Sequence, residues 1–139
     1  MPLIRYRTDD IAGPPEPSPC TCGRTYRTLK RIVGRIEDVV ITPDQRYVGR
    51  LDAAFKYSPG IRLSQIVQDT PDEIVVNIVK ASSYNSKDEE TLIRELRARL
   101  GHEIKIKLRS VDAIPAGSNG KLKFVISRPG REALHHLHA

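Results

Sequence analysis

The segment from Ser86 to Gly101, SKDEETLIRELRARLG, constrains the fold of this chain more than any other stretch. Ser86 is a typical N-cap residue, and Glu89 three positions later completes a capping box. Gly101 follows as a stop signal. Apolar residues recur between these ends at helical spacing, at Leu92, Ile93, Leu96 and Leu100. The segment therefore predicts an amphipathic helix with one apolar face.

The segments around this helix have the patterns of β-strands. Within residues 103–114, Ile104, Ile106 and Leu108 alternate with Lys105, Lys107 and Arg109, which predicts a strand with one apolar face. Residues 61–70 and 72–81 are β-rich runs that predict a hairpin. Residues 29–49 predict a strand, a turn and a short return strand, followed by a short helix over 51–60 and, later, a strand over 122–126. The expected fold class is α+β, with a small, mainly antiparallel sheet and helices packed on one face.

The first 30 residues differ from the rest of the chain. They contain Pro14, Pro15, Pro17 and Pro19, and proline interrupts both helices and central strands. We expect an extended Pro-rich arm here, placed before the β-hairpin. The last stretch, REALHHLHA, is compatible with a short helix or with a frayed tail, and the tail is the expected form.

Charge and hydropathy limit the classes of function. The 139 residues carry a formal net charge of +6, which permits binding to polyanions. No apolar run approaches the roughly 20 residues that a membrane span needs, and the N-terminus lacks the apolar core of a signal peptide. We therefore expect no membrane association and a cytoplasmic location.

Cys20 and Cys22 are separated by one residue, so a disulfide between them would be strained. They are weak candidates for a zinc site, because the histidines at 102, 135, 136 and 138 have no convincing ligand spacing. A site completed by residues outside this chain remains open. Reduced thiols are the expected form, and we predict no metal site.

Three short motifs follow one another along the chain: Tyr6 to Asp10 (YRTDD), Gly34 to Asp38 (GRIED) and Pro115 to Lys121 (PAGSNGK). Each is weak when taken alone. The third contains Asn-Gly directly before Lys121, which is typical of a tight turn. The question that it raises is whether the turn simply exposes this lysine or delivers its ammonium group to a site.

In this order, the three motifs resemble the C-terminal signatures of the adenylate-forming (AMP-binding) enzyme superfamily. The stretch CTCGRTYRTLKRIVGRIEDVVITPD is most similar to the phenylacetate–CoA ligase branch and its relatives in capsule biosynthesis. The resemblance covers about residues 3–128. It implies that residues 1–33 are a remnant of a large N-terminal ligase domain, residues 34–128 the mobile C-terminal domain, and residues 129–139 a tail.

The resemblance also implies roles for single residues. Asp10 would hydrogen-bond the ribose of ATP, Arg35 would reach the same sugar, and Glu37 would stand at the hinge of the mobile domain. Lys121 would be the catalytic lysine of the adenylation step. Asp9 replaces a glycine of the family motif, and Glu37 replaces an aspartate.

The ligands implied for the complete enzyme are ATP or AMP with magnesium, an acyl substrate and coenzyme A. The segment after Glu37 lacks the glycine-rich pattern common in CoA ligases, which leaves thiol transfer open. The large domain is the implied partner, and a homodimer through the exposed arm is a further expectation. Without the large domain, we expect the chain to be inactive.

Two alternatives without catalysis compete with this interpretation. A nucleic-acid-binding α+β module could use the basic strand with Lys105, Lys107 and Arg109. Sheets that stack bases need exposed aromatic residues, and this chain has two Phe and no Trp, which argues against nucleic acid as a partner. A stand-alone regulatory domain would have kept the fold and lost the chemistry.

Overall fold

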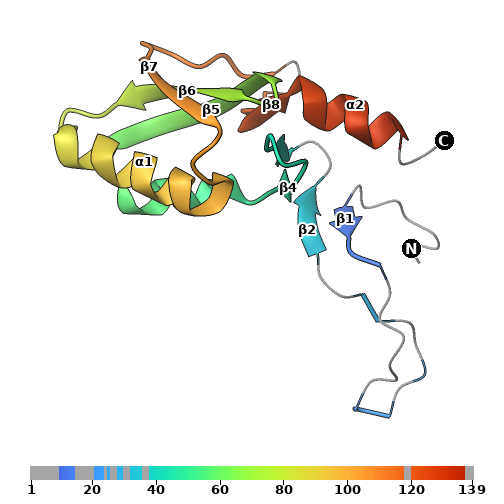
Figure 1. Cartoon of the computed structure of the whole chain (residues 1–139). Helices are drawn as coiled ribbons and strands as arrows, with labels where there is room; N and C mark the ends of the chain where they lie inside the picture. The colour runs from blue at the N-terminus through green and yellow to red at the C-terminus, as the bar shows by residue number, and fades with distance from the viewer. Residues whose placement is uncertain are drawn as a thin grey trace.

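The computed structural model describes residues 10–14, 21–23, 25, 28–29, 32–35, 38–117 and 120–136. Along the chain (Figure 1), the elements are β1 (Asp10–Ala12), β2 (Ile32–Arg35), β3 (Val40–Ile41), β4 (Tyr47–Val48), the 3-10 helix η2 (Leu51–Tyr57), β5 (Ile61–Thr70), β6 (Glu73–Lys80), α1 (Ser86–Leu100), β7 (Lys105–Ser110), β8 (Val125–Ser127) and α2 (Arg128–His136). Most of the predicted arm lies outside the described residues, and β1 is the part of it that forms a strand. The expectation of a frayed tail is corrected: Arg128–His136 form α2, whose start is capped by the Ser127 hydroxyl, which accepts from the Gly130 amide at 2.9 Å. Residues 137–139 lie outside the described residues.

The main sheet has four strands in the order β7-β6-β5-β8. The predicted hairpin is confirmed, because β5 and β6 pair antiparallel. Both outer pairings, β6 with β7 and β5 with β8, are parallel. The α+β class is confirmed, and the expectation of a mainly antiparallel sheet is corrected at its two edges. β6 and β7 are parallel because α1 forms a crossover connection that returns the chain to the same end of the sheet.

The core lies between one face of this sheet and the helices α1 and η2, which contact each other (Figure 1). Along β6, buried side chains alternate with half-buried ones, so that Ile74, Val76 and Ile78 point toward the core. The leucines of α1 form the opposite wall, as their spacing predicts. The fully buried members of the core cluster include Leu92 and Leu96 of α1 and Leu51 and Ala54 of η2. The predicted apolar face of the helix is therefore confirmed.

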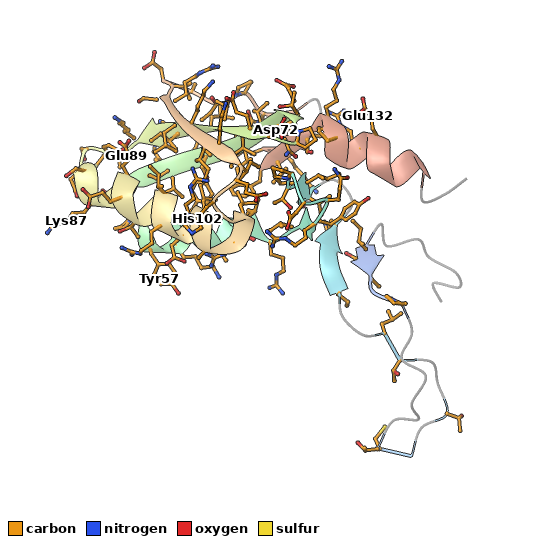
Figure 2. All side chains as sticks on the ribbon, viewed as in Figure 1. Tyr57, Asp72, Lys87, Glu89, His102 and Glu132 are labelled. Atoms are coloured by element: carbon orange, nitrogen blue, oxygen red, sulfur yellow. The ribbon has the colours of Figure 1, made fainter. Side chains whose placement is uncertain are left out.

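The start of α1 differs by one residue from the sequence expectation. Asn85, not Ser86, is the N-cap residue, and it forms a capping box with Asp88. The Asn85 side chain accepts a hydrogen bond from the Lys87 amide at 3.0 Å, and Asp88 accepts one from the Asn85 amide at 3.0 Å. Figure 2 shows Lys87 and Glu89 at this end of α1. The NSKD stretch contains two suitable cap residues in a row, which explains the shift by one.

A buried glutamine joins the β3–β4 hairpin to the main sheet. Gln68 of β5 is fully buried, and its side chain donates to the Ile41 carbonyl at 2.5 Å and accepts from the Ile41 amide at 3.0 Å. The Ser127 hydroxyl donates to the same Gln68 side chain at 2.8 Å and accepts from the Gly130 amide at 2.9 Å. This network, called the Gln68 clip below, connects β3, β5, β8 and the start of α2.

Among the described helices, none is both long and apolar enough to cross a membrane.

Candidate functional site

A pocket of about 390 Å³ opens where the β1–β2 hairpin meets the rest of the chain. Its volume lies within the range of about 300–1,000 Å³ that is usual for small-molecule sites. Its walls come from the β1–β2 hairpin, the segment after β2, the junction of β4 with η2, and the loop before β8. The lining residues are Asp10, Ile32, Arg35, Asp38, Arg50, Leu51, Asp52 and Phe124.

Two of the predicted nucleotide-binding residues line this pocket together. β1 and β2 pair antiparallel, and the register places Asp10 directly opposite Arg35. Directly opposed residues on such a ladder have Cβ atoms about 4.5–5.5 Å apart. The sequence separates these residues by 25 positions, and the hairpin brings them to one wall of the pocket.

The apolar part of the lining is firmly anchored. The ring of Phe124 packs edge-on against Phe55 of η2, with ring centroids 5.2 Å apart and an interplanar angle of 87°. The Phe124 carbonyl accepts a hydrogen bond from the Ile66 amide at 2.8 Å, which ties this wall to the main sheet. Leu51 is buried beside it. A flat apolar group could pack against this wall while polar groups reach the charged side.

Arg50 lies at the pocket in an unusual backbone conformation. Its φ is 57° and its ψ is 37°, in the left-handed region, and it occupies the N-cap position of η2 without a side-chain cap bond. The left-handed region costs a residue with a Cβ roughly 1–2 kcal/mol. Gln45, in the β3–β4 turn, also has a positive φ of 61°. Two non-glycine residues after the predicted hinge, Gln45 and Arg50, thus adopt left-handed backbone conformations.

The β3–β4 turn is held by three polar side chains. The Thr42 hydroxyl donates to the Asp44 carboxylate, and the Arg46 guanidinium contacts that carboxylate at 2.5 Å. These two interactions, the Thr42 hydrogen bond first, lower the pKa of Asp44 from its ordinary value. Arg46 also donates to the Leu100 carbonyl at 3.3 Å, which links the turn to the end of α1.

Lys121 follows the turn that its motif predicts. The Gly120 amide donates to the Gly117 carbonyl at 2.9 Å, and the Gly117 amide donates to the Lys121 carbonyl at the same distance. Gly120 has a positive φ of 72°, a conformation for which glycine is well suited. Ser118 and Asn119 lie outside the described residues. Lys121 is exposed, three positions before Phe124, and is not among the residues that line the pocket.

Glu37, the predicted hinge residue, lies outside the described residues. Its neighbour Asp38, the last residue of the predicted hinge motif, lines the pocket. Sequence reasoning did not identify Arg50, Asp52 or Phe124 as lining residues. Positive φ at an arginine has no sequence signal, and a phenylalanine near a strand is ordinarily assigned to the core.

The cysteine motif gives no support to a metal site within the described residues. Cys22 is exposed, and Cys20 lies outside the described part of the chain. His102 follows the end of α1 in the body of the fold (Figure 2). The described residues contain no group of three or more His, Cys, Asp or Glu side chains that could hold a metal ion. No step below depends on magnesium.

Comparisons with known proteins agree with the fold. Residues 40–128 match a family model described as the CapK C-terminal domain. No curated protein sequence matches the chain.

Among solved structures, the chain is similar to an open conformation of 2-hydroxyisobutyryl-CoA ligase in complex with 2-HIB-AMP and CoA, with a TM-score of 0.54 and 25% identity over 91% of this chain. The postadenylation state of the same ligase with 2-HIB-AMP gives a TM-score of 0.54 and 24% identity over 98% of this chain, and supports the fold alone. The chain spans 29% and 31% of the lengths of these two ligase chains.

Proposed function

Since the chain belongs to the CapK C-terminal domain family, we propose that it forms the C-terminal portion of an ATP-dependent, AMP-forming acyl ligase. The observation that carries the proposal is the family match over residues 40–128, which includes the segment after the hinge motif and the complete lysine motif. The likeness to a CoA ligase, of which this chain spans less than a third, supports a large additional domain in the active enzyme.

The proposed reaction begins with adenylation. An oxygen of the acyl carboxylate attacks the α-phosphorus of ATP, and the bond from that phosphorus to the bridging oxygen of the β-phosphate breaks. Pyrophosphate leaves with the bonding electron pair, and acyl-AMP forms. Negative charge accumulates on the oxygens around the phosphorus, and a positioned cation stabilises it in a site that excludes water.

We assign three residues of this chain to that step. The Asp10 carboxylate accepts hydrogen bonds from the ribose hydroxyls, and Arg35, its neighbour across the β1–β2 ladder, contacts the same sugar. The pocket supports this pairing because both residues line it. Lys121 supplies the ammonium group that bridges the acyl carboxylate and the α-phosphate. Its position after a glycine-containing turn supports a role in which the loop delivers the side chain.

The second proposed step transfers the acyl group. A thiol of coenzyme A type attacks the acyl carbonyl carbon, the bond from that carbon to the AMP oxygen breaks, and AMP leaves as the thioester forms. Rotation about Glu37 would separate the two steps, since Lys121 is needed in the first. The positive φ at Gln45, where the chain has no glycine, supports a bend in this segment without the glycine-rich pattern that is common in CoA ligases.

Exchange of labelled pyrophosphate into ATP tests the adenylation proposal. The ligase that contains this chain is assayed with a panel of carboxylic acids, and this chain by itself should show no exchange. Lys121→Ala should lower the exchange rate by about 10²–10³, the usual cost of one stabilising donor. Thioester formation from preformed acyl-AMP should fall much less.

Lys123→Ala is the matched control. Lys121 and Lys123 are both exposed and lie two positions apart, so the overall charge changes equally in the two variants. Equal losses of exchange in both variants would show that Lys121 contributes only general positive charge. No exchange with any acid would contradict the ligase proposal itself.

A further inference from the structure

Arg50 occupies a position for which arginine is a poor local choice. The left-handed backbone favours glycine or asparagine, and an N-cap position favours serine, threonine, aspartate or asparagine. Arg50 belongs to neither group, has a φ of 57°, and makes no cap bond. A backbone outlier of this kind motivates a search for function nearby. The side chain at this position lines the pocket that also contains Asp10 and Arg35.

The two guanidinium groups of the pocket are available to bind a ligand. The side chains of Arg35 and Arg50 make no hydrogen bond or ion pair within the described part of the chain. Asp38, by contrast, already has an interaction partner. Asp10 and Asp52 also line the pocket, and their carboxylates would weaken the binding of an anion to one arginine alone. The two guanidinium groups together offset these two charges.

The chemistry of the lining residues distinguishes between kinds of anionic ligand. Guanidinium groups bind phosphate oxygens with paired hydrogen bonds, and carboxylates such as Asp10 accept hydrogen bonds from hydroxyls. The apolar part of the lining, with Phe124 and Leu51, suits a flat apolar ring. A ligand with a phosphate, a sugar and a base satisfies all three features at once. An aromatic carboxylic acid satisfies only two of them, because it lacks hydroxyls that could donate to Asp10.

We propose that Arg50 is a further ligand-binding residue of this pocket and contacts a phosphate group of a nucleotide. The inference rests on the proposed function, which supplies nucleotide-bearing ligands. It adds a residue outside the three motifs, and it gives a reason for the costly backbone conformation at that position. The phosphate could belong to AMP or to the nucleotide part of a coenzyme A type thiol, and the experiment separates these sources.

The test is a titration of the 139-residue chain with AMP, adenosine and coenzyme A, followed by chemical-shift changes in its amide spectrum. AMP should bind more tightly than adenosine, because adenosine lacks the phosphate. Arg50→Gln should weaken AMP binding about 10- to 100-fold, the usual range for a lost charge-assisted pair, and leave adenosine binding unchanged. Dependence of coenzyme A binding on Arg50, with no such dependence for AMP, would assign the phosphate to the thiol.

Two further variants separate binding from folding. Arg50→Gly relieves the left-handed strain, so it should raise the melting temperature and still lose AMP affinity. Arg62→Gln removes an exposed arginine of β5 that does not line the pocket, and AMP affinity should stay within twofold. A variant that loses AMP affinity because it unfolds would have a lower melting temperature, so unfolding cannot explain the result expected for Arg50→Gly.

The proposal is overturned if the wild-type chain binds none of the three probes. It is also overturned if Arg50→Gln binds AMP and coenzyme A as tightly as the wild type, or loses adenosine and AMP equally. Pyrophosphate exchange by the ligase that contains this chain is independent of these outcomes. Exchange without Arg50-dependent binding would therefore leave the proposed function standing and reject this inference.

Discussion

Gln68 shows how much of this fold depends on one polar side chain. Its amide satisfies both backbone groups of Ile41 and also accepts from Ser127, although the side chain is completely buried. A buried amide without partners would cost several kcal/mol, and here its partners come from two other strands. The Gln68 clip therefore makes the hairpin after the hinge motif part of the same body as the main sheet.

Gln68→Leu should lower the free energy of unfolding by about 3 kcal/mol or more. The leucine preserves most of the volume, but the amide and carbonyl of Ile41 and the hydroxyl of Ser127 lose partners, at about 1–3 kcal/mol for each buried group. Urea denaturation measures this cost. Gln65→Leu is the control, because Gln65 is also buried and makes one recorded side-chain bond, to the Lys123 carbonyl. Equal costs in the two variants would contradict the clip.

The sequence could not predict the Gln68 clip. The strand around Gln68 is predicted correctly, but a glutamine is assigned to solvent unless a partner is known. Its partner, Ile41, lies 27 positions earlier in the chain. The burial of a polar side chain such as Gln68 depends on tertiary contacts, and these cannot be predicted from periodicity or composition.

At the level of elements, Asp88 joins the start of α1 to the entry of β5. Its buried carboxylate accepts hydrogen bonds from the Asn85 amide at 3.0 Å and from the Gly60 amide at 3.1 Å. The Ser58 hydroxyl donates to the Asp88 carbonyl at 3.0 Å. A Cβ at position 60 would collide with the Asp88 carboxylate, which accounts for glycine there.

Asp88→Asn should destabilise the protein by about 1–3 kcal/mol, because the new amide group must point one N–H₂ toward a backbone donor. Glu89→Gln, one position along, should change stability by less than about 0.5 kcal/mol, since Glu89 is exposed and its recorded partner is the Tyr84 hydroxyl. Thermal unfolding of both variants checks the difference. A similar loss in each would indicate that only the charge of the first helical turn matters.

Most helices and strands could be predicted from the sequence, but whether neighbouring strands run parallel or antiparallel could not. The spacing of leucines in α1 and the alternation in β7 predict their type and their buried faces, because both depend on local periodicity. The parallel edges depend on where the 111–124 connection carries the chain, and that path depends on long-range packing. The resemblance implied that Asp10 and Arg35 reach the same sugar. Their opposition across the β1–β2 ladder, and the presence of Arg50 and Phe124 at the pocket, emerged only from the fold.

At the level of the whole molecule, we expect the β1–β2 pair to be locally less stable than the central strands β5 and β6. Ile32 of β2 is 67% exposed, whereas Ile66 of β5 and Val76 of β6 are completely buried. Amides of β1 and β2 should therefore exchange with solvent much faster than those of β5 and β6. Hydrogen exchange followed by mass spectrometry tests this in the 139-residue chain. Protection of β1 and β2 equal to that of β5 and β6 would contradict the expectation.

The position of β8 has a consequence for the chain while it is being synthesised. β8 follows all the other strands that the structure describes, and it covers one side of β5 by parallel pairing from Ile66 to Gln68. Until Val125 leaves the ribosome, that side of β5 has unpaired backbone groups beside apolar side chains, and Gln68 lacks Ser127. Such an edge pairs readily with other chains. A nascent or prematurely terminated polypeptide that ends before Val125 should consequently depend on chaperones, even though most of its core residues are already present.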